Sequence, residues 1–226
     1  MRKMNYIFLH GRGGSGKDTQ ADLLAQELPN VLRISTGEIY RGAKSGEGEY
    51  GRFHTLVEPY IEHVDSGHFL PDSIILQMVG SVIEEKVGQG FKNFIFTGFP
   101  RTEEQQTAID EWVKENGEKG LVQSINILYA VLEDHTRERS EKRRISDIET
   151  KGGSRYDDQP KAVESKLKSF TTLTLPMLKK LNDEGLLNVI RANRSIEEIF
   201  ERTLEVIGQN SANVESSSRQ RVEGEA

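Results

Sequence analysis

The amino-acid sequence predicts an α/β fold in which helices flank a parallel β-sheet. Two observations lead to this prediction. Five short apolar runs are separated by longer polar stretches with helical spacing, a pattern typical of parallel strands that are covered on both faces. A glycine-rich loop, residues 11–16, follows the first apolar run and precedes the first helical stretch. The order strand, glycine loop, helix is that of a phosphate-binding P-loop, so we expect a P-loop NTPase-type sheet.

The expected strands and helices alternate along the chain. The apolar runs predict strands at 6–9, 31–34, 94–96, 125–131 and 187–190. Apolar residues at helical spacing predict helices at 18–28, 73–87, 103–114, 160–181 and 195–207, the fourth of them broken near Pro176. Thr102 is placed to cap the third helix, and Ser195 with Glu198 forms a capping box for the last.

The glycine-rich loop predicts a binding site for a nucleoside triphosphate. Gly11 and Gly16 have the spacing of the P-loop motif, and a loop this short turns its backbone N–H groups inward around a phosphate. Lys17 adds a mobile positive charge, and the following helix directs its positive end at the same anion. The expected ATP-binding residues here are Gly11, Gly13, Gly14, Ser15, Gly16, Lys17, Asp18 and Thr19. Arg12 is expected to face solvent.

Composition narrows the classes of protein that fit. Charged residues make up 29% and hydrophobic residues 35% of the 226-residue chain, as in a soluble α/β domain. No apolar run approaches the ~18 residues of a membrane span. Cysteine is absent, which excludes a disulfide framework and a thiolate zinc site. The net charge of −6 weighs against a general nucleic-acid binder. We therefore expect a cytoplasmic protein with neither a membrane nor a nucleic acid as partner.

Two segments interrupt the alternation of strands and helices, at 37–70 and 140–157. Insertions at the carboxyl edge of a parallel sheet become lids over the ligand site. We expect a core of residues 1–36, 72–138 and 158–208, a nucleoside monophosphate-binding insertion at 37–71 and a short lid at 139–157. Residues 209–226 are polar and lack an apolar period, which predicts a disordered tail.

Four sequence blocks, in the right order, resemble the adenylate kinase family of nucleoside monophosphate kinases in its short-lid form. Residues 11–20 are similar to the family's G-x-x-G-x-G-K-G-T-Q, and 35–38 with Arg41 to S-T-G-D-x-x-R. Residues 98–102 with Gln105 are similar to D-G-F-P-R-T-x-x-Q. Arg139 and Arg143, with 155–158, are similar to R-x-x-x-R and R-x-D-D, and 67–72 to G-x-L-V-P-D.

The resemblance implies a role for each matching residue. Arg41 and Arg101 would hold the acceptor phosphate, and Gln105 would read its base. Arg139 would flank the donor adenine. The implied AMP-binding residues are Thr36, Gly37, Arg41, Leu70, Gly98, Arg101, Gln105, Arg155 and Lys166. The implied ATP-binding residues beyond the loop are Arg139 and Arg143, and the implied catalytic residues are Lys17, Arg101, Arg143 and Arg155. These cations suit phosphoryl transfer, which needs positioning and charge neutralisation rather than a protein nucleophile.

Three residues depart from the family pattern. Thr97 stands where the family has an aspartate before Gly-Phe-Pro-Arg, Asp18 where it has glycine, and Lys166 where it has arginine. One hypothesis is that Asp18, with Thr19, holds Mg²⁺ through water molecules in place of the missing aspartate. The alternative is that Asp18 only complements the helix dipole.

The resemblance implies reversible phosphoryl transfer from Mg-ATP to AMP, giving two ADP, by a monomer that uses Mg²⁺ and no zinc. Thr36, Thr102 and Gln105 resemble the residues of the AMP-using members, so the resemblance favours AMP over UMP or CMP as the acceptor. Two alternatives remain open: a P-loop kinase for another monophosphate or a small metabolite, and a catalytically weakened nucleotide-binding regulator.

Overall fold

The fold is built around one five-stranded parallel sheet, in a computed structural model that describes residues 4–116, 122–154 and 156–223. The strands are β1 (Met4–His10), β2 (Val31–Ser35), β3 (Asn93–Thr97), β4 (Val122–Ala130) and β5 (Leu187–Arg191). The α-helices are α1 (Lys17–Glu27), α2 (Thr36–Ser45), α3 (His54–Val57), α4 (Ile61–Asp65), α5 (Asp72–Gly88), α6 (Glu103–Asn116), α7 (Glu133–Lys151), α8 (Pro160–Ser169), α9 (Leu175–Asp183) and α10 (Ile196–Glu223). Short 3₁₀ turns occupy Glu49–Phe53, Glu58–Tyr60 and Tyr156–Asp158.

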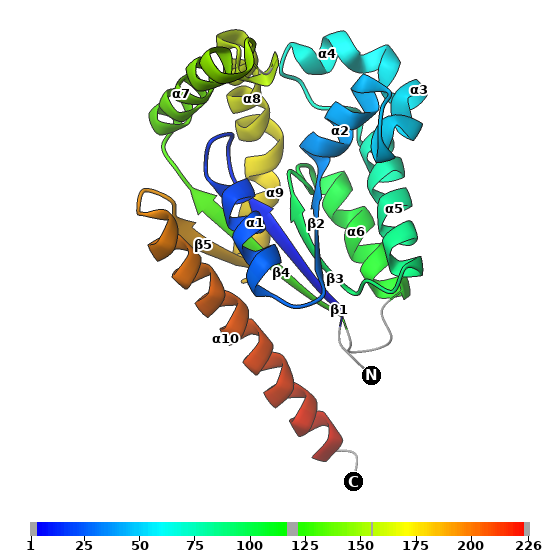
Figure 1. The fold of residues 1–226 in the computed structure, drawn as a ribbon. Coiled ribbons are helices and arrows are strands. Elements are labelled where there is room, and N and C mark those ends of the chain that lie inside the picture. Colours follow the sequence, from blue (N-terminus) through cyan, green and yellow to red (C-terminus); the bar gives the residue numbers. More distant parts are fainter. Residues whose placement is uncertain (1–3, 117–121, 155, 224–226) are drawn as a thin grey trace.

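Alternate residues of the strands belong to two different hydrophobic clusters, which explains the continuous apolar runs. In β1, Tyr6 and Phe8 pack with α2, α5 and α6, whereas Ile7 and Leu9 pack with α1 and α10. All four side chains are buried. A strand covered on both faces needs apolar residues at every position, so the predicted parallel sheet is confirmed. Figure 1 shows α1 and α10 crossing one face of the sheet, with α5 and α6 beyond it.

The strand order, β2-β3-β1-β4-β5, determines which loops meet at the carboxyl edge of the sheet. β1 lies between β3 and β4, so the loop after β1 is flanked by the loops that follow its two neighbours. Thr97 at the end of β3 is level with Leu9 of β1 and with Ser35 of β2. Ligands of open parallel sheets bind at this edge, where neighbouring connections diverge. Figure 1 shows α7 and the α2–α4 segment on either side of this edge.

The local signals for helix ends are confirmed. The backbone N–H of Gln105 donates to Thr102 Oγ1, so the Thr102 side chain caps α6. Ser195 and Glu198 donate their backbone N–H groups to each other's side chains, as a capping box requires. The helix predicted across 160–181 widens into a π-helical turn, Phe170–Thr174, immediately before Pro176. Proline lacks an N–H and its ring crowds the preceding turn, which accounts for the interruption.

The structure extends α10 to Glu223, beyond the end predicted at residue 207, and the disordered tail at 209–226 stays a prediction. Residues 209–223 contain neither proline nor glycine, so nothing in the sequence stops the helical backbone hydrogen bonds. Figure 1 shows this end of α10 extending away from the sheet. None of the helices formed by the described residues has the length and apolar character that crossing a bilayer requires.

Candidate active site

A cleft of about 380 Å³ opens at the carboxyl edge of the sheet. It runs from the glycine-rich loop, past the start of α2 and the loop after β3, to α7 and α8. The predicted site residues that line it are Gly11, Gly13, Gly14, Lys17, Asp18, Thr19, Gly37, Arg41, Gly98, Arg101, Arg143 and Lys166. A second pocket of about 80 Å³ adjoins it and is lined by Thr36, Leu70 and Gln105 together with Arg41, Arg101 and Lys166. The fold therefore brings together residues from four sequence blocks.

The glycine-rich loop has the tight curvature that its sequence predicts. Gly11 has a φ of +149°, and a Cβ atom there would lie 2.5 Å from Ser15 Oγ and 3.0 Å from the Tyr129 carbonyl oxygen. Ser15 is buried beneath the loop, and its hydroxyl has no hydrogen-bond partner among the described residues. Gly16 precedes the first turn of α1 in the left-handed conformation. Backbone N–H groups are thus gathered at a helix N-terminus, an arrangement that binds phosphate.

Asp18 lies among cations at the start of α1. Its carboxylate is 3.4 Å from Lys17 Nζ and 3.7 Å from Arg33 Nη2. Burial favours the neutral carboxyl, but the charge of Lys17, the nearby Thr97 hydroxyl and Arg33 outweigh it and hold the pKa of Asp18 well below its usual range. The Thr97 hydroxyl is itself buried and lacks a well-aligned hydrogen-bond partner in the described chain. Asp18 and Thr97, from different sequence blocks, therefore face each other.

Arg33 of β2 connects the core to the segment that begins at α2. Its guanidinium donates to both carboxylate oxygens of Glu38, at 2.9 and 2.6 Å, and its Nε is 3.2 Å from Asp22 Oδ1. Paired hydrogen bonds of this kind hold both groups in one orientation. Arg33, Asp22 and Glu38 line the cleft. The sequence analysis included Glu38 only as part of the 35–38 block and did not single out Arg33 or Asp22. For Arg33, the sequence did carry a signal: it is a charged residue within the otherwise apolar run of β2.

Two arginines mark the part of the cleft next to the smaller pocket. Arg101 donates from Nε to the Gly98 carbonyl oxygen at 2.7 Å, and its guanidinium carbon is 4.5 Å from the centre of the Phe69 ring. Gly98 has a φ of +75°, and a Cβ atom there would lie 2.6 Å from Thr36 Oγ1 and 2.7 Å from Arg101 Nη2. Arg41 makes no side-chain hydrogen bond or ion pair with the residues that the structure describes, so its charge is available to a ligand.

The predicted donor-side residues are placed in three different ways. Arg143 of α7 pairs with Asp158, a fully buried carboxylate, through Nε at 2.6 Å and also through Nη2, and it lines the cleft. Arg139 instead donates to the carbonyl oxygens of Gly14 and Ala192, at 2.9 and 3.1 Å, and thereby ties α7 to the glycine-rich loop. Arg155 lies outside the described residues.

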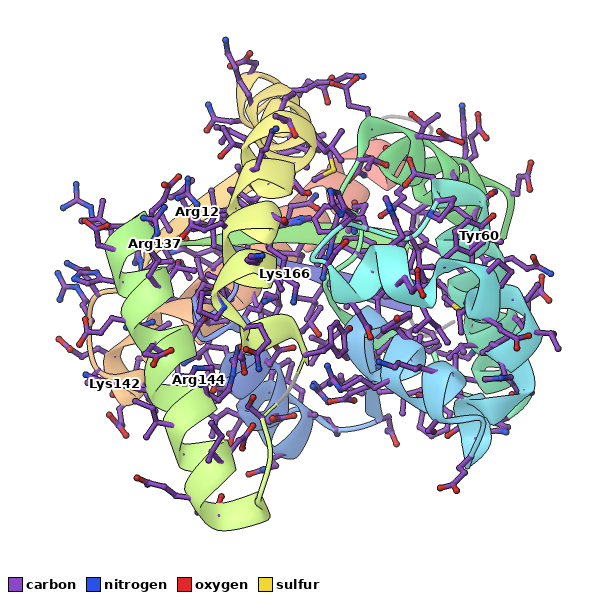
Figure 2. All side chains as sticks on the ribbon, turned by 90° about the horizontal axis from the view of Figure 1, so that it is seen from above. Arg12, Tyr60, Arg137, Lys142, Arg144 and Lys166 are labelled. Atoms are coloured by element: carbon purple, nitrogen blue, oxygen red, sulfur yellow. The ribbon has the colours of Figure 1, made fainter. Side chains whose placement is uncertain are left out.

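Figure 2 shows Lys166 between the α7–α8 side and the α2–α4 side of the molecule, as expected for a residue that lines both pockets. Its Nζ is 5.9 Å from the centre of the Tyr156 ring. Lys142, by contrast, lies on the outer side of α7, where its side chain is exposed and pairs with Glu138.

The expectation that Arg12 faces solvent is wrong. Its guanidinium donates to the Val131 carbonyl oxygen and to Glu133 Oε1, both at 3.1 Å, and lies 5.0 Å from the centre of the Phe170 ring. These partners belong to the start of α7 and the turn after α8, so Arg12 joins the glycine-rich loop to both. The loop sequence alone could not show this, because the partners are more than 100 residues away.

His10 ends β1 directly beneath the cleft. It is 4% exposed, and its Nε2 lies 3.0 Å from Asn126 Oδ1. Burial lowers the pKa of His10 to about 4, against the opposing effect of its hydrogen bonds to Asn126 and the Pro100 backbone. The imidazole is therefore neutral at physiological pH and serves as part of the core. Among the described residues, His, Asp and Glu form no group of three or more that could hold a metal ion.

Comparison with known proteins agrees with this geometry. The family model described as adenylate kinase matches residues 9–186, more than half of the chain. The chain belongs to the adenylate kinase family. It is 32% identical to the adenylate kinase of Parabacteroides distasonis, over 89% of this chain and 96% of that protein. It is also 32% identical to the adenylate kinase of Bartonella tribocorum, over 85% of this chain and 94% of that protein. The predicted family and fold are confirmed, and these matches support phosphoryl transfer between ATP and AMP as the activity.

Proposed function

We propose that this adenylate kinase family member transfers the terminal phosphoryl group of Mg-ATP reversibly to AMP and forms two ADP within the cleft described above. The observation that supports this reaction most strongly is the continuity of the two pockets. The larger one begins at the glycine-rich loop, and both are lined by Arg41, Arg101 and Lys166. A donor triphosphate on the loop and an acceptor phosphate at the two arginines would then share one space. We further propose that the chain acts as a monomer, since one chain supplies every part of this cleft.

The proposed reaction is a direct in-line transfer without a covalent enzyme intermediate. An oxygen of the AMP phosphate forms a bond to the terminal phosphorus of ATP while the bond to the bridging oxygen breaks. Lys17 and the loop N–H groups orient the donor, and Arg41 and Arg101 orient the acceptor. Arg143, held by Asp158, and Lys166 place further positive charge beside the transferred group. Closure of the α7–α8 side and the α2–α4 side over the cleft would exclude water, which would otherwise accept the phosphoryl group.

The residues around Asp18 fit a hydrated Mg²⁺ ion that accompanies ATP. A carboxylate and a buried hydroxyl without a well-aligned partner, Asp18 and Thr97, face one another beside the phosphate loop. Mg²⁺ keeps several of its water molecules, and these would donate hydrogen bonds to both groups and to Thr19. When bound, the ion neutralises charge on the outer phosphates. In this proposal Asp18 orients those water molecules from the start of α1.

A double-mutant cycle tests this assignment. Asp18→Gly removes the proposed carboxylate, and Thr97→Asp places one at the end of β3. If the two positions serve the same water molecules, Thr97→Asp restores much of the Mg²⁺ response that Asp18→Gly loses. Mn²⁺ affinity of the ATP complex, measured by electron paramagnetic resonance, gives a readout that does not depend on turnover. Additive effects on both rate and Mn²⁺ affinity would contradict the exchange.

The joint donor–acceptor site is tested by thermal unfolding with a bisubstrate analogue, in which two adenosines are joined by a chain of phosphates. A ligand at a thousand times its dissociation constant stabilises the folded state by about 4 kcal/mol. We expect this analogue to raise the unfolding temperature more than ATP and AMP do at equal concentration. An increase no larger than that from ATP alone would contradict a shared site.

A further inference from the structure

Gln105 lies at the smaller pocket with its amide held in one orientation. The side chain is 2% exposed and lines the pocket. Its Oε1 accepts a hydrogen bond from the Arg101 backbone N–H at 2.8 Å, and its Nε2 donates to Asp72 Oδ1 at 2.6 Å. A backbone N–H can only donate and a carboxylate can only accept. Rotation of the amide by 180° would therefore replace two hydrogen bonds with two repulsive contacts.

The carboxylate that holds Gln105 is itself held in place. Thr102 Oγ1 donates to Asp72 Oδ2 at 2.7 Å, and the same hydroxyl accepts the backbone N–H of Gln105 at 3.1 Å. Asp72 begins α5, whereas Thr102 immediately precedes α6 and Gln105 lies in its first turn. The two helices thus fix both oxygens of the carboxylate, and the arrangement does not depend on a flexible surface contact.

The orientation of this amide has a chemical consequence for a purine in the pocket. With one N–H and one lone pair committed to the protein, the amide has one N–H and one oxygen lone pair left for a ligand. Adenine presents a donor, its 6-amino group, beside an acceptor, its ring N1. Hypoxanthine and guanine present the reverse, an acceptor O6 beside a donor N1–H. A freely rotating amide matches either pattern, but a fixed amide matches only one of them for a given placement of the base.

We propose that Asp72 is a specificity-determining positioning residue, which fixes the Gln105 amide so that the pocket accepts 6-aminopurine monophosphates and rejects 6-oxopurine monophosphates. This inference rests on the proposed function, since it requires the smaller pocket to hold the acceptor base. The acceptor phosphate, bound by Arg41 and Arg101, limits the ways in which the base can enter. Asp72 does not touch the reacting atoms and acts only through Gln105.

The test is the variant Asp72→Asn, whose own amide can either accept from or donate to Gln105. With ATP as donor, we expect the kcat/KM for inosine monophosphate relative to AMP to rise several-fold, because the Arg101 backbone N–H still favours the wild-type orientation of the amide. For AMP, we expect the KM to rise. The kcat for AMP and the KM for ATP should stay within about threefold of wild type. Dissociation constants for AMP and inosine monophosphate, measured by calorimetry, should change in the same ratio.

Three further variants separate the effect from general damage. Glu104→Gln removes a negative charge from an exposed position in the same turn of α6 and should leave selectivity unchanged. Thr102→Val removes the hydroxyl that holds Asp72 and should relax selectivity in the same direction as Asp72→Asn. Thr102→Ser keeps that hydroxyl and should keep the wild-type ratio. Circular dichroism during thermal unfolding establishes that each variant is folded.

The outcomes distinguish this inference from the function on which it rests. A wild type that prefers AMP, with variants Asp72→Asn and Thr102→Val that keep the wild-type AMP to inosine monophosphate ratio, would overturn the role of Asp72 and leave the proposed function intact. A wild type that neither binds nor phosphorylates AMP would overturn both.

Discussion

The buried imidazole of His10 leads to a quantitative prediction about stability and pH. Its pKa is about 4 in the folded protein, because burial penalises the charged form, whereas an unfolded chain has the ordinary value of about 6.5. Between these values the unfolded state binds more protons than the folded state. Stability therefore rises with pH across this window and is lost as the pH falls from about 6.5 towards 4.

The magnitude follows from the two pKa values. At pH 5 the imidazole of the unfolded chain is almost fully protonated, while His10 in the folded chain is mostly neutral. This difference in protonation between the unfolded and folded states lowers the unfolding free energy by about 2 kcal/mol from pH 7 to pH 5. This is a large share of the 5–15 kcal/mol that is typical of a folded domain.

Urea denaturation at both pH values checks this prediction, with His10→Gln as the comparison. Glutamine does not titrate and keeps a polar group beside Asn126. The variant is expected to be less stable than wild type at pH 7, because the replacement packs less well. Its loss of stability from pH 7 to pH 5 should nevertheless be smaller than that of wild type by about 2 kcal/mol. Equal losses in the two proteins would refute the assignment of a neutral, buried His10.

Three other substitutions have distinct expected outcomes. Gly98→Ala, at a positive φ and with a Cβ atom 2.6 Å from Thr36 Oγ1 and 2.7 Å from Arg101 Nη2, should raise the KM for AMP at least tenfold while ATP binding, measured by calorimetry, stays unchanged. Arg12→Lys should raise the KM for ATP several-fold and lower the unfolding free energy by about 1–2 kcal/mol, because an ammonium cannot reproduce the forked hydrogen bonds. Steady-state kinetics and urea denaturation measure the two effects, and wild-type values in both would contradict the prediction. Ser195→Ala removes a helix cap and should cost about 1 kcal/mol of unfolding free energy with no change in turnover; a change in kcat would mean that the start of α10 influences the site.

The sheet could be predicted from the sequence because each strand carries its signal locally. A strand buried on both faces is apolar at every position, and each of the five apolar runs coincides with an observed strand. The length of α7 could not be predicted in this way, because no apolar pattern runs along it. Its surface pairs, Lys142 with Glu138 and Arg144 with Glu141, stabilise a helix without an apolar stripe. The charged stretch therefore suggested an insertion without a helix of its own, and in the structure it forms the second half of α7, which ends at Lys151 with Gly152 as its C-cap.

The candidate site divides in the same way. The glycine-rich loop and the arginines beside it could be predicted because each belongs to a short motif whose residues are close together in the sequence. The contacts that orient them could not, since they join residues far apart in the chain. Asp72 and Gln105 are 33 residues apart, and Arg12 reaches Glu133 across 121 residues. Only the packing of α5 on α6, and of α7 against the loop, brings these partners together.

The most direct test of the central claim is ADP formation from ATP with AMP, UMP, CMP or GMP as the acceptor, across a Mg²⁺ titration. The account predicts rapid, Mg²⁺-dependent ADP formation with AMP alone. ATP binding without ADP formation from any acceptor, at every Mg²⁺ concentration, would contradict it and leave a nucleotide-binding protein that does not transfer phosphate.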